Sequence, residues 1–407
     1  MIERGLLHEY FDGVAVKRLS AVEADTKRSH QHEFNGVEQL KKILGSERAK
    51  FPTRFVWLGD EQEALSEDGF LTWYDSRENH PTRSEYRLYF PTTPVSELAR
   101  EGDALFIARR TDGSVMVIVT PAASTIQSQL LWLFGIPDQP TLSFEAQEVT
   151  NETGGQLDFA VRYIFDELGI EYEERDVARL DALLEKFKLR FPTTREFSAL
   201  ARESLPDVSP LGDADAALLA WMQQEEQLFR RMERHVVSER LRAGFVAGDN
   251  TDVDGFLSFS LSVQNRRKSR AGYALEHHLE ALFQAHRLRF DRGAETENRN
   301  KPDFLFPGAV EYRDPAFPEA RLSMLGAKST LKDRWRQVLA EAQRIRDKHL
   351  LTLEPGISEN QTEQMRSEHV HLVVPSALQN TYQPAQREHL MRLSDFIALM
   401  RKREVAA

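Results

Sequence analysis

Residues 321–337 read RLSMLGAKSTLKDRWRQ, and an alternating, partly apolar run within them ends at a lysine, Lys328. Such alternation is typical of a β-strand. The next residues, LKDRWRQVLAEAQRIRDKHLL (331–351), predict a strong helix, because apolar side chains recur on one stripe: Trp335, Val338, Leu339, Ala342 and Ile345. A strand that delivers a lysine to the start of a helix predicts an α/β domain in this part of the chain.

A second strand is predicted upstream, in NKPDFLFPG (residues 300–308). Pro302 cannot donate to a β-ladder and often marks the start of a strand, so Asp303 is expected at the strand mouth. The 24 residues between Asp303 and Lys328 fit a strand, a loop and a second strand, which would bring the two side chains together. A carboxylate in this place can ligate a hard cation such as Mg²⁺ through oxygen.

A carboxylate-bound metal and a lysine are suited to phosphodiester hydrolysis. The metal neutralises developing charge and lowers the pKa of a water, and the lysine orients that water or donates to a phosphate oxygen. Such sites usually have a second acid two residues before the lysine, but that position is Gly326. The candidate replacements are Glu341, expected on the following helix and on the same face as Arg334, and Glu276, early in a predicted helix over 275–288. The pattern alone is weak, since a Pro-Asp followed by a lysine is common by chance.

Basic residues are concentrated in the same part of the chain. Residues 264–348 contain 18 Lys and Arg against 12 Asp and Glu, a balance of +6 in a chain of net charge −11. This pattern is typical of a localised phosphate-binding surface, and a salt-bridged, solvated face is the alternative. The densest run, NRRKSRAG (265–272), is expected either to bind phosphates or to be a solvated helix start, and its basic residues are Arg266, Arg267, Lys268 and Arg270.

The trio Lys332-Asp333-Arg334 follows Lys328 by about one turn. Arg and Lys can donate to guanine O6 and N7, and Asp can accept from cytosine N4, so the trio is a candidate for reading G·C pairs in a major groove. An intrahelical ion pair is the alternative. Tyr312 is a further candidate, as a covalent nucleophile, although packing explains an isolated tyrosine as well.

Composition and periodicity outline the rest of the chain. Its 407 residues include no cysteine, which excludes disulfides and thiolate metal sites, and no apolar stretch long enough to cross a membrane. Residues 1–150 predict a β domain, from short β-prone runs separated by turn signals: FVWLGD, FLTWYDS, YRLYFPTT, ALFIARR and VMVIVTPAA. Residues 145–156 are expected to be a linker, 151–185 a helical connection, and 186–407 the α/β domain, with Thr193 or Thr194 as an early N-cap.

Several of these stretches closely resemble the C-terminal domain of the EcoRII-type restriction endonucleases: SVQNRRKSRAGYALEHHLEALF, NKPDFLFPG, AKSTLKDRWRQVL, LVVPSAL and the entry LRFP. The resemblance covers roughly residues 185–400. It implies a restriction-endonuclease-like fold that uses Mg²⁺ to cut double-stranded DNA. It also implies an active site of Asp303, Lys328 and Glu341, with Glu276 as an auxiliary acid, and metal ligation by the first and third of these.

The same resemblance identifies Lys332, Asp333 and Arg334 with the family's recognition element for CC:GG-containing sites, such as CCWGG. In the N-terminal part, VKRLSAVEADTKRSHQH and TWYDSRENHPTRSEYRLYF resemble the effector domain of these enzymes, a pseudobarrel related to plant B-three DNA-binding domains. This implies DNA contacts by His30, Arg83, Glu85 and Arg87. Pro81 and Tyr86 stand where relatives have lysines, so effector affinity or specificity is expected to differ.

The resulting expectation is a homodimeric type II restriction endonuclease of the type IIE kind. A second DNA site bound at the N-terminal domain would activate it, and a cognate DNA methyltransferase would act on the same site. A cytoplasmic location in a prokaryote is expected, with no membrane partner. The main alternative is a DNA-binding regulatory protein whose nuclease domain is inactive, and a nuclease for methylated or damaged DNA is another.

Overall fold

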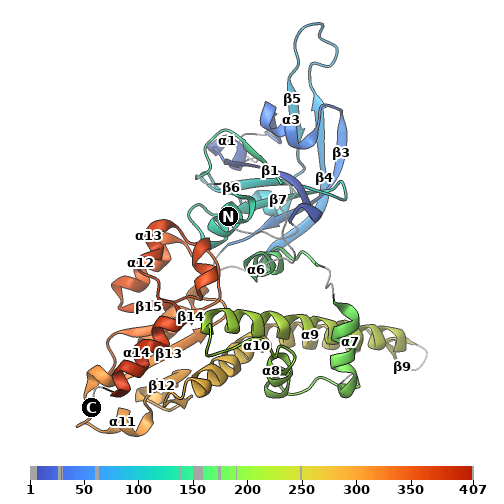
Figure 1. Ribbon diagram of the computed structural model, residues 1–407. Coiled ribbons are helices and arrows are strands. Elements are labelled where there is room, and N and C mark those ends of the chain that lie inside the picture. Colours follow the sequence, from blue (N-terminus) through green and yellow to red (C-terminus); the bar gives the residue numbers. More distant parts are fainter. Residues whose placement is uncertain are drawn as a thin grey trace. The chain divides into compact units, whose positions relative to one another are not determined.

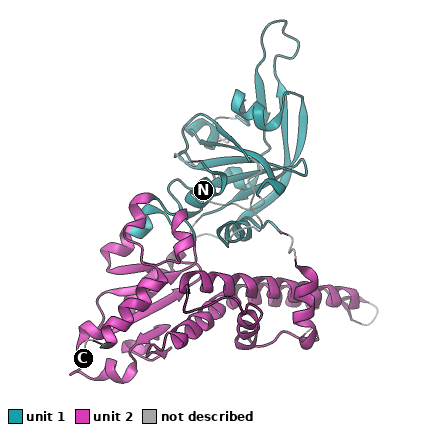
Figure 2. Ribbon diagram, viewed as in Figure 1, with its two compact units in different colours: residues 1–171, 355–362, 381–383 teal, residues 172–354, 363–380, 384–407 magenta. Residues whose placement is uncertain are grey.

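The computed structural model describes residues 7–25, 29, 31–59, 64–136, 139–149, 159–172, 176–188, 190–247 and 250–405 (Figure 1). The chain divides into two compact units (Figure 2). Unit 1 contains residues 1–171, 355–362 and 381–383, and unit 2 contains the remainder. The expected connection over 151–185 is therefore shared between them. Among the described residues, no helix has the length and apolar character that a membrane crossing requires.

Unit 1 is built on one eight-stranded sheet, in the order β2-β5-β4-β3-β7-β6-β1-β8. Neighbouring strands are antiparallel except β3 and β7, which are parallel. Each of the five β-prone runs of the sequence contains part or all of a strand. The bounds are β1 Phe11–Arg18, β2 Glu33–Gly36, β3 Ala49–Trp57, β4 Leu65–Asp75, β5 Tyr86–Tyr89, β6 Ala104–Arg110, β7 Val115–Thr120 and β8 Glu145–Glu148.

The expected linker over 145–156 is wrong in its first part. Residues 145–148 form β8, which pairs with β1 at one end of the sheet, and residues 150–156 lie outside the described part of the chain. The unit is also not purely β. Its helices are η1 Leu7–Glu9, α1 Ala21–Ala24, α3 Glu38–Leu44, α4 Pro94–Leu98, α5 Thr125–Phe134 and α6 Phe159–Leu168. Phe165 of α6 packs edge-on against Tyr10, with ring centroids 4.9 Å apart, so α6 belongs to this unit.

Unit 2 begins with a helical layer: α7 Val177–Leu184, η2 Glu185–Phe187, α8 Thr194–Glu203, α9 Ala214–Ala243 and α10 Val253–Ala285. The predicted N-cap is present, because the Thr193 hydroxyl accepts from the Glu196 N–H in a capping box. The predicted helix over 275–288 is the last part of α10. The basic run 265–272 therefore lies in the middle of a 33-residue helix and not at a helix start. A short hairpin, β9 Val246–Ala247 with β10 Asn250–Thr251, lies between α9 and α10.

The sheet of unit 2 has five strands in the order β11-β12-β13-β14-β15. They are β11 Asp291–Arg292, β12 Phe304–Phe306, β13 Ser323–Lys328, β14 Lys348–Thr352 and β15 Val370–Val373. The first three are antiparallel and the last three parallel, so the unit is α/β, as the sequence predicts. The remaining described elements of this part of the chain are η3 Glu297–Arg299, α11 Ala309–Arg313, η4 Glu319–Arg321, η5 Lys332–Ala340, α12 Glu359–Ser367, η6 Ser376–Thr381, α13 Pro384–Arg387 and α14 Leu393–Val405. The start of α12 and the last residue of η6 belong to the segments of unit 1.

The strong helix predicted after Lys328 is wrong. Residues 332–340 form a 3₁₀ segment, η5, and residues 341–347 make a turn that leads directly into β14. The buried side chains of this stretch, at Trp335, Val338, Ala342 and Ile345, are spaced three and four residues apart, which suits both kinds of helix. Periodicity could not separate them. Glu341 follows η5 with an extended backbone, so it does not share a helical face with Arg334.

Candidate active site

Asp303 and Lys328 lie together on two adjacent strands of unit 2. Asp303 directly precedes β12, and Lys328 ends β13, which pairs antiparallel with β12. One oxygen of Asp303, Oδ2, accepts from the Ala327 N–H at 2.7 Å and from Lys328 Nζ at 2.8 Å. Both side chains keep some exposure, 15% and 18%, so the pair sits at the surface end of the strands and is reachable from solvent. The structure thus brings together the two residues that the sequence paired.

The packing around Gly326 explains why no acid stands there. A Cβ at this position would lie 2.9 Å from Val338 Cγ2 and 3.2 Å from Leu350 Cδ1. Val338 belongs to η5 and is fully buried, so it has no flexible end that could move aside. The segment that carries Glu341 therefore packs on the position where the usual acid would project. Only glycine permits this close approach.

Glu341 shares the electrostatic environment of this pair. The pKa of its carboxyl is raised to about 7, mainly by burial and also by the charge of Asp303, while the charges of Lys328 and Lys348 oppose the shift. Its Oε2 is buried, with no hydrogen-bond partner among the described residues. A buried carboxylate oxygen without a donor is costly unless something else binds it. The structure places Glu341 near the predicted site, although by a turn and not by a helix.

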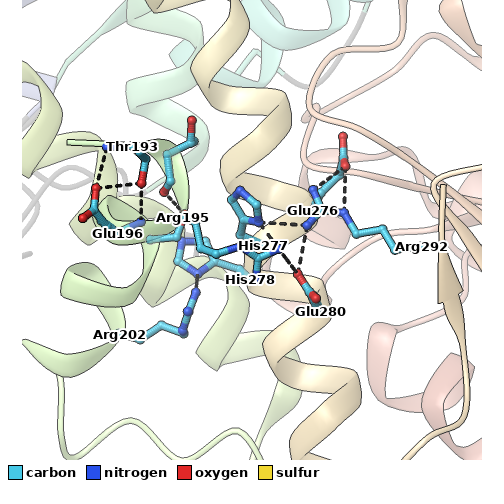
Figure 3. Close-up of polar contacts among 11 residues, drawn as sticks. Thr193, Arg195, Glu196, Arg202, Glu276, His277, His278, Glu280 and Arg292 are labelled. Atoms are coloured by element: carbon cyan, nitrogen blue, oxygen red, sulfur yellow. Dashed lines mark hydrogen bonds and ion pairs between the residues drawn. The ribbon is translucent and has the colours of Figure 1, made fainter. Parts of the chain in front are cut away.

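Glu276 of α10 is held by Arg292 (Figure 3). Arg292 donates to Glu276 Oε2 through Nε at 3.1 Å and through an Nη at 2.6 Å. Burial raises the pKa of Glu276, Arg292 lowers it, and Asp303 raises it again. The other Nη of Arg292 donates to Glu280 Oε2 at 2.9 Å and contacts His277 Nδ1 at 2.8 Å. Burial, followed by the charge of Arg292, lowers the pKa of His277 to about 4, so that ring is neutral near pH 7 and Nδ1 accepts.

The side chains at the site fit a magnesium ion. Within the described ranges, no group of three or more His, Cys, Asp or Glu side chains is arranged to hold a metal. Mg²⁺ does not require one, because it keeps several waters and binds proteins through one or two carboxylates. Asp303 and Glu341 supply two, and the unpaired Oε2 of Glu341 is the atom that such an ion would satisfy.

The basic residues of α10 are engaged within unit 2. The Arg266 guanidinium lies 4.1 Å from the centre of the Phe191 ring, and Arg267 Nε donates to Glu233 Oε2 at 2.7 Å. Arg270 is 8% exposed and paired with Glu226 of α9. A phosphate contact by Arg270 is disfavoured, because that side chain is buried against acids. The Lys268 side chain is outside the described part of the structure.

The predicted recognition trio stands at the start of η5. Lys332 and Arg334 are exposed, while the side chain of Asp333 is not among those described. An Nη of Arg334 donates to the Thr330 hydroxyl, one turn back. Their exposure leaves a role in base contact open, and that role remains a prediction.

The predicted effector contacts of unit 1 lie around β5. Arg83 is exposed, and Glu85 is paired with Arg77 at 2.6 Å and with Arg87. These two arginines lower the pKa of Glu85. His30 is outside the described residues. Tyr86, where the resemblance leads one to expect a lysine, stacks on Trp73 with ring centroids 4.9 Å apart, so its ring is used in packing.

Two residues that hold the site were not found from the sequence. Arg292 positions Glu276, and Lys348 donates to the backbone carbonyl of Glu341 and to those of Ala342 and Ile345. Single charged residues at strand ends carry no spacing signal, so nothing in one sequence marks them. Tyr312 is the opposite case: its hydroxyl donates to both oxygens of Glu297, at 2.7 and 2.6 Å, and the pKa of the phenol is raised, mainly by burial and by this bond. A phenol held in this way is a poor nucleophile.

Comparisons with known proteins agree with these observations. Residues 229–397 match the family model described as EcoRII C terminal. The type II restriction enzyme EcoRII of Escherichia coli is 44% identical over 231 residues, which cover 56% of this chain and 55% of the relative. The chain thus aligns with about half the length of this curated relative.

Two solved structures are similar at a lower level. They are metal-depleted Ecl18kI in complex with uncleaved, modified DNA (19% identity, TM-score 0.44, 56% of this chain and 85% of the other) and a PspGI–substrate DNA complex (16%, 0.44, 52% and 94%). The family match covers Glu276, Asp303, Lys328 and Glu341 in one stretch. Residues 229–397 are therefore a domain of the EcoRII C-terminal family, and the resemblance of this part of the chain to EcoRII-type restriction endonucleases is confirmed.

Proposed function

We propose that the protein is a type II restriction endonuclease that hydrolyses double-stranded DNA with Mg²⁺. The observation that carries the proposal is one site in which Lys328 is bonded to Asp303 and Glu341 presents an unpaired buried oxygen. The related EcoRII is named a type II restriction enzyme, which supports the same reaction. An inactive domain has no use for a costly buried carboxylate, so the regulator alternative is disfavoured.

The residues have distinct roles in this proposal. Asp303 and Glu341 would hold the metal, which when bound would neutralise charge developing on the phosphate and activate water. Lys328 Nζ, oriented by Asp303, would donate to a phosphate oxygen or orient the attacking water. Glu276, fixed by Arg292, is the auxiliary acid at the side of α10.

Recognition is proposed to involve Lys332, Asp333 and Arg334, at a short CC/GG-containing site. The exposure of Lys332 and Arg334 beside the site strand supports it. Replacing Arg334 by Ala is expected to relax discrimination at one base pair by about 1–3 kcal/mol. Relative cleavage rates on single-substitution sites would measure this, and an unchanged preference would contradict the assignment.

A homodimer is proposed through unit 2. The first half of α10 exposes an apolar stripe of four residues, each 45–59% accessible: Val253, Phe256, Leu257 and Leu261. The spacing places these side chains on one helix face, and exposed apolar patches mark contact surfaces. Leu257→Glu is expected to shift sedimentation toward monomer, whereas Val310→Glu, at an exposed apolar position on α11, is the matched control.

Activation by a second DNA site is proposed to act through unit 1, with Arg83, Glu85 and Arg87 in contact with that DNA. The test uses a plasmid with one recognition site and an added oligonucleotide that carries another. The oligonucleotide is expected to accelerate cleavage, and Arg83→Ala to weaken the acceleration without loss of basal cutting. No stimulation of the wild type would remove this part of the proposal.

The enzymatic proposal itself is tested by plasmid digestion with and without Mg²⁺. Wild type is expected to give discrete fragments only with the metal. Asp303→Ala and Lys328→Ala are expected to remain folded and give none. Sequencing of the fragment ends would show the recognised bases, and binding without cutting would favour the regulatory alternative.

A further inference from the structure

Glu341 lies in an irregular turn in which most backbone N–H and carbonyl groups form hydrogen bonds. Residues 341–345 belong to no helix or strand, yet each of their N–H groups has a partner. Glu341 donates to the Val338 carbonyl at 3.1 Å, and Ile345 to the Ala342 carbonyl at 2.9 Å. The three N–H groups between them donate to side chains: to Thr296 Oγ1 at 3.4 Å, to Glu297 Oε2 at 3.1 Å and to the Tyr312 hydroxyl at 3.3 Å.

The carbonyls of the turn converge on one buried ammonium. Lys348, 6% exposed at the start of β14, donates to the carbonyls of Glu341 at 2.5 Å, Ala342 at 3.2 Å and Ile345 at 3.0 Å. An ammonium has three protons, so these three acceptors use its whole capacity. The preceding carbonyl, of Ala340, accepts from Asn300 Nδ2 at 2.8 Å.

The residues that form these bonds are called the cradle below; they are Thr296, Glu297, Asn300, Tyr312 and Lys348. Three of them, Thr296, Glu297 and Asn300, lie in the eight residues that precede Asp303, and Asn300 is the first residue of the motif that supplies this carboxylate. The segment before one acid of the site therefore holds the turn that carries the other.

The cradle fixes a group that is unfavourable for stability. Glu341 is placed where burial opposes its charge and where Oε2 has no partner. A turn shaped only for stability would let this carboxylate reach water. Functional sites typically contain groups in an unfavourable conformation that many surrounding contacts hold in place.

We propose that the cradle, with Lys348 at its centre, positions Glu341 as a metal ligand and sets the metal affinity of the site. Lys348 is a positioning residue, since its contacts are to backbone carbonyls of the turn. This inference rests on the proposed function. It adds a determinant that lies outside the acidic and lysine residues of the site itself.

The test measures metal binding without DNA and without cleavage. Mn²⁺ is added to the full-length protein, and water-proton relaxation gives its dissociation constant. Lys348→Met keeps the length of the side chain and removes its three donors. Partners that orient metal ligands typically contribute 10–100-fold to affinity, so binding about tenfold weaker or more is expected.

The matched control is Lys17→Met in unit 1. Lys17 is equally buried, at 7% exposure, and its Nζ is paired with Glu23 at 2.5 Å, far along the chain from any cradle residue. This variant shows what the loss of a buried lysine does to Mn²⁺ binding when the lysine lies outside the cradle. Its Mn²⁺ dissociation constant is expected to stay within about twofold of that of wild type. If Lys348→Met does not fold, Asn300→Ala provides the test, because it removes the hydrogen bond to the Ala340 carbonyl, directly before the turn. The expected weakening is then about fivefold, the value of one hydrogen bond.

The outcomes separate the two proposals. Mn²⁺ binding that needs Asp303 but is unchanged in Lys348→Met and Asn300→Ala would overturn the cradle and leave the nuclease proposal intact. A wild-type chain that binds no Mn²⁺ would overturn the metal site, and the cradle with it. Weaker binding in Lys17→Met to the same degree would also overturn the cradle, because the effect would then be one of general stability.

Discussion

The two carboxylates proposed to hold the metal are presented by very different kinds of structure. Asp303 precedes a strand, and its oxygen bonds to the backbone and lysine of the neighbouring strand. Glu341 lies in a turn with no repeating structure, fixed by side chains from several places along the chain. Strand pairing already orders the backbone around Asp303, so holding this acid costs little further conformational entropy. Glu341 depends on long side chains, and each of them loses conformational entropy when it is ordered. The Glu341 side of the site is therefore expected to be the more sensitive to substitution at a distance.

The largest expected effect comes from the acids themselves. Asp303→Ala and Glu341→Ala should each reduce the cleavage rate by about a thousandfold or more, because each removes a ligand from an ion that contributes several kcal/mol. Single-turnover cleavage with saturating Mg²⁺ measures it, and circular dichroism checks folding. A Glu341→Ala enzyme that cuts normally would mean that only the strand side holds the metal.

The next effect concerns Gly326. Adding a side chain there should destabilise the protein by about 1–3 kcal/mol, because its Cβ would meet the buried Val338. Consequently, Gly326→Asp should not restore cutting to Glu341→Ala, although it returns an acid to the usual place. Urea unfolding and cleavage assays measure the two parts. Rescue by the double variant would show that η5 can move aside.

A third effect depends on pH and on the absence of metal. Since burial raises the pKa of Glu341 from 4.5 to about 7, the folded chain holds that proton more tightly than the unfolded chain. The stabilising contribution is complete below pH 4.5 and is lost as pH rises through 7. Glu341→Gln cannot titrate at this position, so its stability does not change with pH for this reason. In EDTA, the free energy of unfolding of the wild type minus that of the variant should therefore fall by roughly 1–3 kcal/mol between pH 4 and 8. Urea unfolding at several pH values measures the difference, and a constant difference would contradict a buried Glu341.

The smallest effect is expected for Tyr312→Phe. It removes the bonds to Glu297 and to the turn but leaves Glu341 and Lys348 in place. The cleavage rate should fall about fivefold, which corresponds to the net free energy of about one hydrogen bond. A loss of all activity would instead support Tyr312 as a covalent nucleophile, the option that the held phenol disfavours.

The same contrast explains what the sequence could predict. Alternation and Pro302 located β12 and β13 and paired Asp303 with Lys328. Apolar spacing after Lys328 marked the buried face correctly but suggested an α-helix, because three- and four-residue intervals suit η5 as well. Glu341 was one of two candidate acids from the residues alone and was selected by the family resemblance, and the helical geometry expected for it was wrong. Arg292 and Lys348 act through contacts between distant residues, which a single sequence does not record.

The division of the chain has a consequence for how the protein is made. Unit 1 includes residues 355–362 and 381–383, and the Gln129 side chain of α5 donates to the Pro355 carbonyl at 2.9 Å. A ribosome has therefore synthesised nearly all of unit 2 before the last pieces of unit 1 emerge. Domains usually fold in order during synthesis, but here the N-terminal unit cannot be completed first. Its α5 must wait for these late partners, so unit 1 is expected to reach its final fold only after most of unit 2 has been synthesised.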